Sequence, residues 1–288
     1  YEYFRDENSA FEAFKAGLID LWRETDPKRW QTGYDFPAAR DGRIIKKEIK
    51  TGIPSGLRGF VFNTRKKPFK DMQVRRALSL VLNFDWINKS FFSGTYQRTE
   101  SYFQNSNLSA QGKSASPAEM KILRGAKLPS EILQNGYVAS AGDEKGHNRQ
   151  VRQTALDLLN KSGYAILDGR LAHKRSGDAL EFEILVQTRE DERLALTYSR
   201  MLNSIGVMAK VRYVDATQYQ NRLQSFDFDM IIYNWYASLS PGNEQAFYWG
   251  SAAADQKGSR NYPGIKSKQV DRAIDCLLYT SPSPRDNT

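Results

Sequence analysis

The sequence is poor in cysteine and histidine. One cysteine, Cys276, and two histidines occur in 288 residues, so a disulfide framework or a Cys- and His-rich zinc site cannot organise the fold. No apolar run approaches the ~18 residues that a membrane-spanning helix needs. The first residues, YEYFRDENSAFEAF, lack the charged and apolar regions of a secretory signal. We expect a globular chain whose natural beginning is missing.

The motifs of common catalytic sites are also missing. The sequence has no glycine-rich phosphate loop, no CxxC pair and no nucleophile framed by histidine and an acid. Asp227 and Asp229 share one face of a predicted strand, as paired carboxylates do in acid–base and metal sites. Further converging ligands are lacking, because His147 and His173 lie in polar segments without a ligand spacing. We therefore expect no metal, no cofactor and no enzymatic activity.

Positive charge is in excess but dispersed. The formal net charge is +9, and an excess of this sign suits nucleic acid or an anionic membrane surface. Lysines and arginines stand mostly singly or in pairs with acids between them, and the longest run, Arg65–Lys67, adjoins a proline. This dispersal favours a solvated surface over a nucleic-acid-binding patch. The hydrophobic share of 40% supports a real core, and the length suits two ordinary domains.

Residues 57–86 combine a strand, a linker and a helix. Residues 59–63 form a short apolar run typical of a strand, and Pro68 ends the polar stretch that follows it. Asp71 is a candidate N-cap for a helix. Apolar residues then recur at the spacing of one helix face, namely Val74, Ala77, Leu78, Val81 and Leu82. We expect the chain to pass from one lobe to another at this linker.

Helices and strands alternate in the second half of the chain. A helix should end at Gly163, and strict alternation over residues 180–186 predicts a half-buried strand. Thr188 and Asp191 form a variant of the capping box, and Gly206 ends the helix that they begin. The remaining expected elements are a strand at 207–213, a short helix opened by Asp215 and Gln218, and a buried strand at 226–235. This order predicts a mixed or parallel sheet covered by helices.

These patterns resemble a known family. The strand ending in FNT, the basic linker and the helix VRRALSLVLNFDWI resemble the family 5 extracytoplasmic solute-binding proteins, the peptide and nickel group that serves ABC importers. SLSPGNEQ and GSRNYPGI are similar to the branch for oligopeptides and peptide-like microcin C compounds. The resemblance covers residues 1–275. It implies a periplasmic-binding-protein-like α/β fold with two lobes (type II), truncated at both ends, with residues 1–62 in lobe I and residues 63–275 in lobe II.

We have further expectations for the two ends of the chain. Asn8 or Ser9 should cap a first helix, and a strand should follow at residues 18–23. At the other end, residues 276–288, CLLYTSPSPRDNT, resemble translated sequencing adapter. We expect this tail to be non-native, to lack helical or strand periodicity and to pack poorly.

Candidate ligand-binding residues lie at the end of the strand over residues 226–235. Aromatic and polar side chains with a Pro-Gly turn suit a ligand crevice at the carboxyl end of a sheet strand. The candidates there are Trp235, Tyr236, Ser238, Ser240, Asn243 and Glu244. In the resembling family an aspartate in this loop often anchors a peptide's amino group. Ser238 and Ser240 replace it here, which leaves Glu244 as the nearby carboxylate and weakens the case for a simple di- or tripeptide.

Arginines are the candidate anchors for a ligand carboxylate. Arg189 would stand in the first turn of a helix, where free N–H groups and the helix dipole favour an anion. The resemblance fits Arg193 equally well, and a surface arginine paired with Glu190 or Glu192 is the alternative. Arg260 and Tyr262 would be ligand contacts or supports of their loop.

Two aromatic sets are weaker candidates. Trp22, Trp30 and Tyr34 could line the cleft from lobe I, and Tyr96, Tyr102 and Phe103 could contact the ligand from lobe II. Packing within the core is the default interpretation for both sets.

The function that the resemblance implies is transport. An extracytoplasmic, periplasmic protein would capture an oligopeptide or peptide-like ligand between two lobes and deliver it to the permease subunits of an ABC importer. We expect a monomer that binds no nucleic acid. The alternatives are a basic nucleic-acid-binding module and a carboxylate-based hydrolase.

Overall fold

The computed structural model describes residues 3–126, 128–139, 142 and 149–280. The chain divides into two compact units. The helical unit comprises Tyr1–Thr51, Phe84–Gln97 and Gly142–Gly146, and the sheet unit comprises Gly52–Asn83, Arg98–Ala141 and His147–Thr288. The strand that ends at Phe62 is hydrogen-bonded within the sheet unit. The predicted lobe boundary between residues 62 and 63 stays a prediction.

The helical unit is described as helices joined by turns. Its helices are α1 (Glu7–Lys15), α2 (Pro27–Thr32), α3 (Pro37–Arg40) and α6 (Phe84–Phe92). Asp6, rather than Asn8 or Ser9, caps α1, since its carboxylate accepts a hydrogen bond from the Ser9 N–H at 2.9 Å. The strand expected at residues 18–23 was a wrong prediction. A strand needs a partner for its backbone groups, and none pairs there among the described residues of this unit.

Aromatic packing forms the core of the helical unit. The Trp22 indole and the Tyr34 hydroxyl both donate to the Glu24 carboxylate, at 3.1 and 3.0 Å. Both rings contact Phe11, with centroids 5.8 and 5.5 Å apart. Trp22 and Tyr34 are half-buried and pack against buried Phe11, in keeping with the default interpretation.

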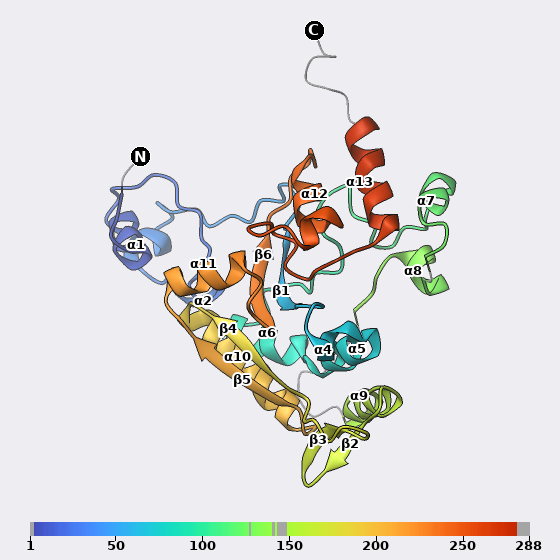
Figure 1. The fold of residues 1–288 in the computed structure, drawn as a ribbon. Helices are drawn as coiled ribbons and strands as arrows, with labels where there is room; N and C mark the ends of the chain where they lie inside the picture. The colour runs from blue at the N-terminus through green and yellow to red at the C-terminus, as the bar shows by residue number, and fades with distance from the viewer. Residues whose placement is uncertain (1–2, 127, 140–141, 143–148, 281–288) are drawn as a thin grey trace. The chain divides into compact units, whose positions relative to one another are not determined.

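A four-stranded mixed sheet organises the sheet unit (Figure 1). The strand order is β1 (Leu57–Phe62), β6 (Met230–Trp235), β4 (Glu181–Val186) and β5 (Met208–Tyr213). β4 runs parallel to both β5 and β6, whereas β1 runs antiparallel to β6. The mixed sheet and the strands of the second half are confirmed.

A two-stranded hairpin was not predicted. β2 (Tyr164–Leu167) pairs antiparallel with β3 (Arg170–His173). The turn between them contains Asp168 and Gly169, both at positive φ. An Asp-Gly pair with positive φ at both positions is the favoured two-residue turn of a hairpin, so the signal was present in the sequence.

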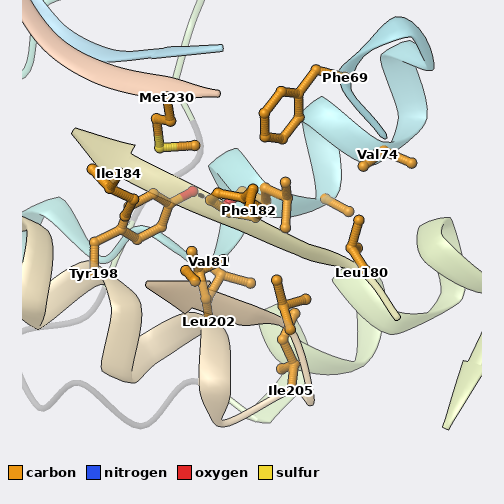
Figure 2. Close-up of a cluster of buried hydrophobic side chains, with 14 of the residues drawn as sticks. Phe69, Val74, Val81, Leu180, Phe182, Ile184, Tyr198, Leu202, Ile205 and Met230 are labelled. Carbon is orange, nitrogen blue, oxygen red and sulfur yellow. Dashed lines mark hydrogen bonds between the residues drawn. The ribbon is translucent and has the colours of Figure 1, made fainter. Parts of the chain in front are cut away.

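Helices cover both faces of the sheet. On the first face, α5 (Met72–Val81), α9 (Arg149–Lys161) and α10 (Arg189–Asn203) enclose one apolar cluster. Figure 2 shows this cluster, in which Phe182 and Ile184 of β4 meet Tyr198 and Leu202 of α10. On the second face, α11 (Ala216–Gln224) and α12 (Glu244–Trp249) pack with the other side of β6. This layering buries the sheet on both sides.

The predicted helix starts are confirmed by their caps. Asp71 accepts from the Gln73 N–H at 2.7 Å, Thr188 from the Asp191 N–H at 3.1 Å, and Asp215 from the Gln218 N–H at 2.9 Å. The expectation of a half-buried strand at 180–186 was incomplete, because Leu185, which should face solvent, is also buried. The second helical layer covers that face.

The remaining elements are short apart from the last helix. They are α4 (Lys67–Lys70), α7 (Pro117–Ile122), α8 (Ser130–Asn135), the 3-10 helix η1 (Ala252–Ala254) and α13 (Lys268–Thr280). α13 corrects the expectation for the tail, since residues 276–280 continue the helix. Ile274, Leu277 and Leu278 keep the helical spacing of i, i+3 and i+4. Residues 281–288 lie outside the described part of the chain.

Candidate functional site

The carboxyl ends of three strands meet at one edge of the sheet. Because β4, β5 and β6 are parallel to one another, Val186, Tyr213 and Trp235 end their strands on the same side. β1 begins there, with Leu57 opposite Trp235. Ligands of open α/β sheets bind beyond this type of edge. We call it the carboxyl edge.

Five aromatic rings form a continuous row beside this edge. Successive centroids are 4.7 Å (Tyr102 to Trp249), 4.8 Å (Trp249 to Trp235), 5.0 Å (Trp235 to Tyr233) and 4.5 Å (Tyr233 to Tyr262) apart. These distances are those of interacting ring pairs. We call this row the aromatic wall. It brings together Trp235, Tyr262 and the weaker candidate Tyr102, and it adds Tyr233 and Trp249, which were not predicted.

Trp235 is a structural member of the wall. Its side chain is only 5% exposed, and its indole N–H donates to the Arg260 carbonyl at 3.2 Å. The expected open stacking face at Trp235 is thus covered by protein. The adjacent Tyr236 is 76% exposed, because side chains alternate between faces at the end of a strand.

The polar loop that follows β6 is stabilised by its own side chains. The Ser238 hydroxyl donates to the Ser240 carbonyl at 3.0 Å and accepts from the Ser240 N–H at 3.3 Å. Asn243 is exposed and stands at the N-cap of α12 without a side-chain cap bond. Ser238 and Ser240 therefore shape the loop, and their predicted contact with a ligand stays a prediction.

Glu244 also bonds within its own loop. Its Oε1 accepts from the Gly242 N–H at 2.9 Å and from the Gln245 side-chain amide at 3.1 Å. Burial opposes the ionised carboxylate, but these hydrogen bonds outweigh it and lower the pKa of Glu244 below its ordinary 4.5. The carboxylate thus clamps the Pro241–Gly242 turn.

We expect this clamp to weaken in acid. Because the folded pKa of Glu244 is lowered, its contribution to stability is present above pH 4.5 and is lost as the pH falls through the folded value. Glu244→Gln should therefore lower the melting temperature at pH 7 and have a smaller effect at pH 3. A melting difference that is the same at both pH values would contradict the ionised clamp.

Arg189 is a surface arginine at the start of α10. Its guanidinium pairs with Glu192 at 2.7 Å, lies 4.4 Å from the Tyr213 ring centroid and leaves the side chain 77% exposed. The first turn of α10 also contains Glu190 and Asp191, so three acids oppose an anion there. Arg193, one turn on, is exposed too. The geometry of Arg189 is that of a surface arginine paired with a neighbouring acid, the alternative given in the sequence analysis.

The two predicted halves of the site lie on different faces of the sheet. α10, which carries Arg189 and Arg193, packs on the first face. Trp235 and Tyr262 lie in the apolar cluster of the second face. The face on which a helix packs depends on long-range contacts, so sequence spacing alone could not separate these candidates.

Arg58 forms a cross-link at the carboxyl edge that was not predicted. Its guanidinium, on β1, pairs with Glu190 at 2.9 Å and Asp191 at 2.8 Å. These bonds fix the start of α10 to β1.

Asp227 and Asp229 form structural ion pairs near the amino end of β6. Lys66 lies 4.0 Å from Asp227 and 3.7 Å from Asp229, and Arg222 lies 3.4 Å from Asp227. Asp229 also accepts a hydrogen bond from the Glu183 N–H at 3.0 Å. Within the described ranges no group of three or more His, Cys, Asp or Glu side chains is placed to hold a metal ion. His147 lies outside those ranges.

Comparison with known proteins identifies the family. The mixed sheet with helical layers belongs to the periplasmic-binding-protein-like α/β class, as the match to the oligopeptide-binding protein AppA of Bacillus subtilis shows. That structure, solved with a nonapeptide, matches with a TM-score of 0.62 at 19% identity over 100% of this chain and 49% of its own. Residues 1–257 match the family described as "Bacterial extracellular solute-binding proteins, family 5 Middle". The chain belongs to this family.

Two relatives from Agrobacterium fabrum are more similar in sequence. The chain is 42% identical over 285 residues to "Peptidoglycan-binding protein YepA" and 37% identical over 286 residues to "Probable peptide-binding protein YejA". The alignments cover 96% and 97% of this chain but 46% of each relative. The chain therefore spans about half the length of these relatives. No helix in the described part of the chain is both long and apolar enough to cross a bilayer.

Proposed function

We propose that the protein carrying this chain captures an oligopeptide or peptide-like ligand for an ABC importer. The observation that carries the proposal is the carboxyl edge itself, where the exposed rings of Tyr236 and of Tyr102, at the end of the aromatic wall, lie with the polar loop that follows β6. A mostly apolar surface with a few placed polar groups suits peptides, whose backbone needs hydrogen bonds and whose side chains need apolar contacts. Family membership and the names of the two relatives support it.

Membership of the family also supports a proposed location, oligomeric state and set of partners. We propose a periplasmic location, a monomeric protein, delivery to the permease subunits of the importer, and binding without catalysis or cofactor. In the proposed two-lobe arrangement, the sheet unit belongs to lobe II. The predicted contacts Tyr236, Ser240, Asn243 and Glu244 would surround the ligand beside the wall, with Tyr102 at its far end.

Thermal shift of the complete protein tests this function. We expect defined tripeptides to nonapeptides, or peptides released from peptidoglycan, to raise the melting temperature, since a ligand at 100 times its Kd stabilises by about 2.7 kcal/mol. Short DNA and RNA duplexes test the nucleic-acid alternative at the same salt concentration. Stabilisation by nucleic acid but by none of the peptides would overturn the proposal.

A variant locates the ligand. Tyr236→Ala removes an exposed ring and should weaken peptide binding by roughly 1 kcal/mol or more if the ring stacks on the ligand. Unchanged affinity would move the ligand away from the end of β6.

A further inference from the structure

The loop over residues 258–265 is locked from within. Asn261 is 0% exposed, and its side-chain amide donates to the Gly250 and Ile265 carbonyls, each at 2.9 Å. Its carbonyl oxygen accepts from the Ile265 N–H at 2.8 Å. Ser259, 1% exposed, donates its hydroxyl to the Ala253 carbonyl. Both neighbours of Arg260 in the chain are therefore buried and fully bonded.

Arg65 and Thr64 hold the same loop from the strand β1 side. The Arg65 guanidinium donates to the Tyr262 carbonyl at 3.0 Å and to the Asn261 carbonyl at 2.9 Å. It also lies 3.9 Å from the Phe226 ring centroid. The Thr64 N–H donates to the Pro263 carbonyl at 2.9 Å. The backbone carbonyls of residues 261, 262 and 263 are thus all held by donors of Thr64 and Arg65.

Arg260 is the outward-facing charge of this fixed loop. Its side chain is exposed, while its backbone carbonyl is tied to the Trp235 indole at 3.2 Å. The neighbouring Tyr233, Tyr248 and Tyr262 raise the pKa of the Arg260 guanidinium above its ordinary value. These three tyrosines are packed side chains of the second face.

Arg260 also differs from three other arginines at and near the sheet. Arg58, Arg189 and Arg222 each pair with a carboxylate at 2.7–2.9 Å. No carboxylate pairs with Arg260 among the residues that the structure describes. A guanidinium prefers a carboxylate in a bidentate geometry, so this charge is open to one from outside the chain.

We propose that Arg260 binds a carboxylate of the ligand, with the tyrosine hydroxyls around it as further donors, and that it determines specificity for anionic ligands. This inference rests on the proposed function. Because the loop is already fixed, little backbone freedom is lost on binding, and such preorganisation raises affinity. The carboxylate can be the terminal group of a peptide or an acidic side chain, and the test separates these sources.

The experiment uses calorimetry on the complete protein with four tetrapeptides. They are Ala-Phe-Ala-Ala and Ala-Glu-Ala-Ala, each as the free acid and as the C-terminal amide. We expect an acid to bind about ten- to a hundredfold more tightly than its amide if the terminal carboxylate is bound, given typical energies of charged hydrogen bonds. If the side-chain carboxylate is bound, the Glu peptides should bind more tightly than the Phe peptides in both forms.

Variants assign the preference to Arg260. Arg260→Ala should abolish it, and Arg260→Lys should keep only part of it, because lysine has the charge but not the bidentate fork. The matched control is Arg170→Ala, an exposed arginine of β3 beside the amino end of β5, which should keep the full preference. Arg189→Ala tests the other candidate anchor, and this variant should also keep the full preference.

The outcomes distinguish a failure of the Arg260 anchor from a failure of the proposed peptide-binding function. If no peptide binds the unsubstituted protein, both the proposed function and the proposed role of Arg260 are overturned. If peptides bind but Arg260→Ala keeps the preference, or Arg189→Ala abolishes it, the anchor is overturned while the function stands. Equal binding of all four peptides by the unsubstituted protein also overturns it.

Discussion

Trp235→Ala should destabilise the protein by about 3–5 kcal/mol, the usual cost of removing a buried tryptophan. The ring is 5% exposed and contacts Tyr233 and Trp249, so truncation leaves a cavity in the middle of the aromatic wall. It also leaves the Arg260 carbonyl without the indole N–H. Urea denaturation of the two proteins measures the difference. A loss of this size is a large part of the 5–15 kcal/mol that typically stabilises a folded protein.

Tyr236→Ala is the matched control for this stability measurement. The two residues are adjacent, but Tyr236 is 76% exposed, so its truncation should change the free energy of unfolding by no more than about 0.5 kcal/mol. Trp235→Phe should fall between them, because it keeps most of the packing and loses the indole N–H. Equal stability of Trp235→Ala and Tyr236→Ala would show that the wall does not pack as described.

Arg65→Ala should cost about 2–4 kcal/mol, since hydrogen bonds from a charged donor are worth more than neutral ones and buried carbonyls lose their partner. The guanidinium donates to the carbonyls of Ala254, Asn261 and Tyr262. Burial lowers the pKa of Arg65, which shows that its charge is partly removed from water. Denaturation gives the stability change, and hydrogen exchange of residues 259–264 reports whether the loop is loosened.

Arg65→Lys distinguishes charge from geometry. Lysine keeps the charge but cannot reach three carbonyls in one plane, so we expect it to recover less than half of the loss. Lys67→Ala is the neutral control, because Lys67 is an exposed member of the same linker and its ion pair is with exposed Asp178. Arg65→Ala with unchanged stability and unchanged exchange would refute the role of Arg65 as the support of this loop.

Local patterns predicted most of the sheet unit. Asp71, Thr188 and Asp215 cap the helices that they were expected to cap, because capping depends on residues within one turn. The strands at 57–62 and 230–235 were found from short apolar runs bounded by polar residues. Their antiparallel pairing, however, was not predicted, since register between distant strands is set by tertiary contacts.

The candidate site was only partly predictable for the same reason. The sequence placed Trp235 and Tyr262 near a ligand but could not show that Trp235 is buried or that α10 packs on the other face from the wall. Arg65 was interpreted as part of a basic linker, although its guanidinium is bonded to carbonyls almost 200 residues further on. Long-range bonds of this type leave no spacing signal in the sequence.

The bond between Thr64 and Pro263 has a consequence for how the protein is made. The two residues are 199 positions apart, and a ribosome adding ~5–20 residues per second needs roughly 10 to 40 s to cover that distance. For most of this interval, until residue 235 has been added, the apolar strand β1 has no β6 to pair with, and unpaired strands of this type are exposed to aggregation. The aromatic wall contains Tyr262, so it can be completed only after the chain beyond residue 263 has emerged.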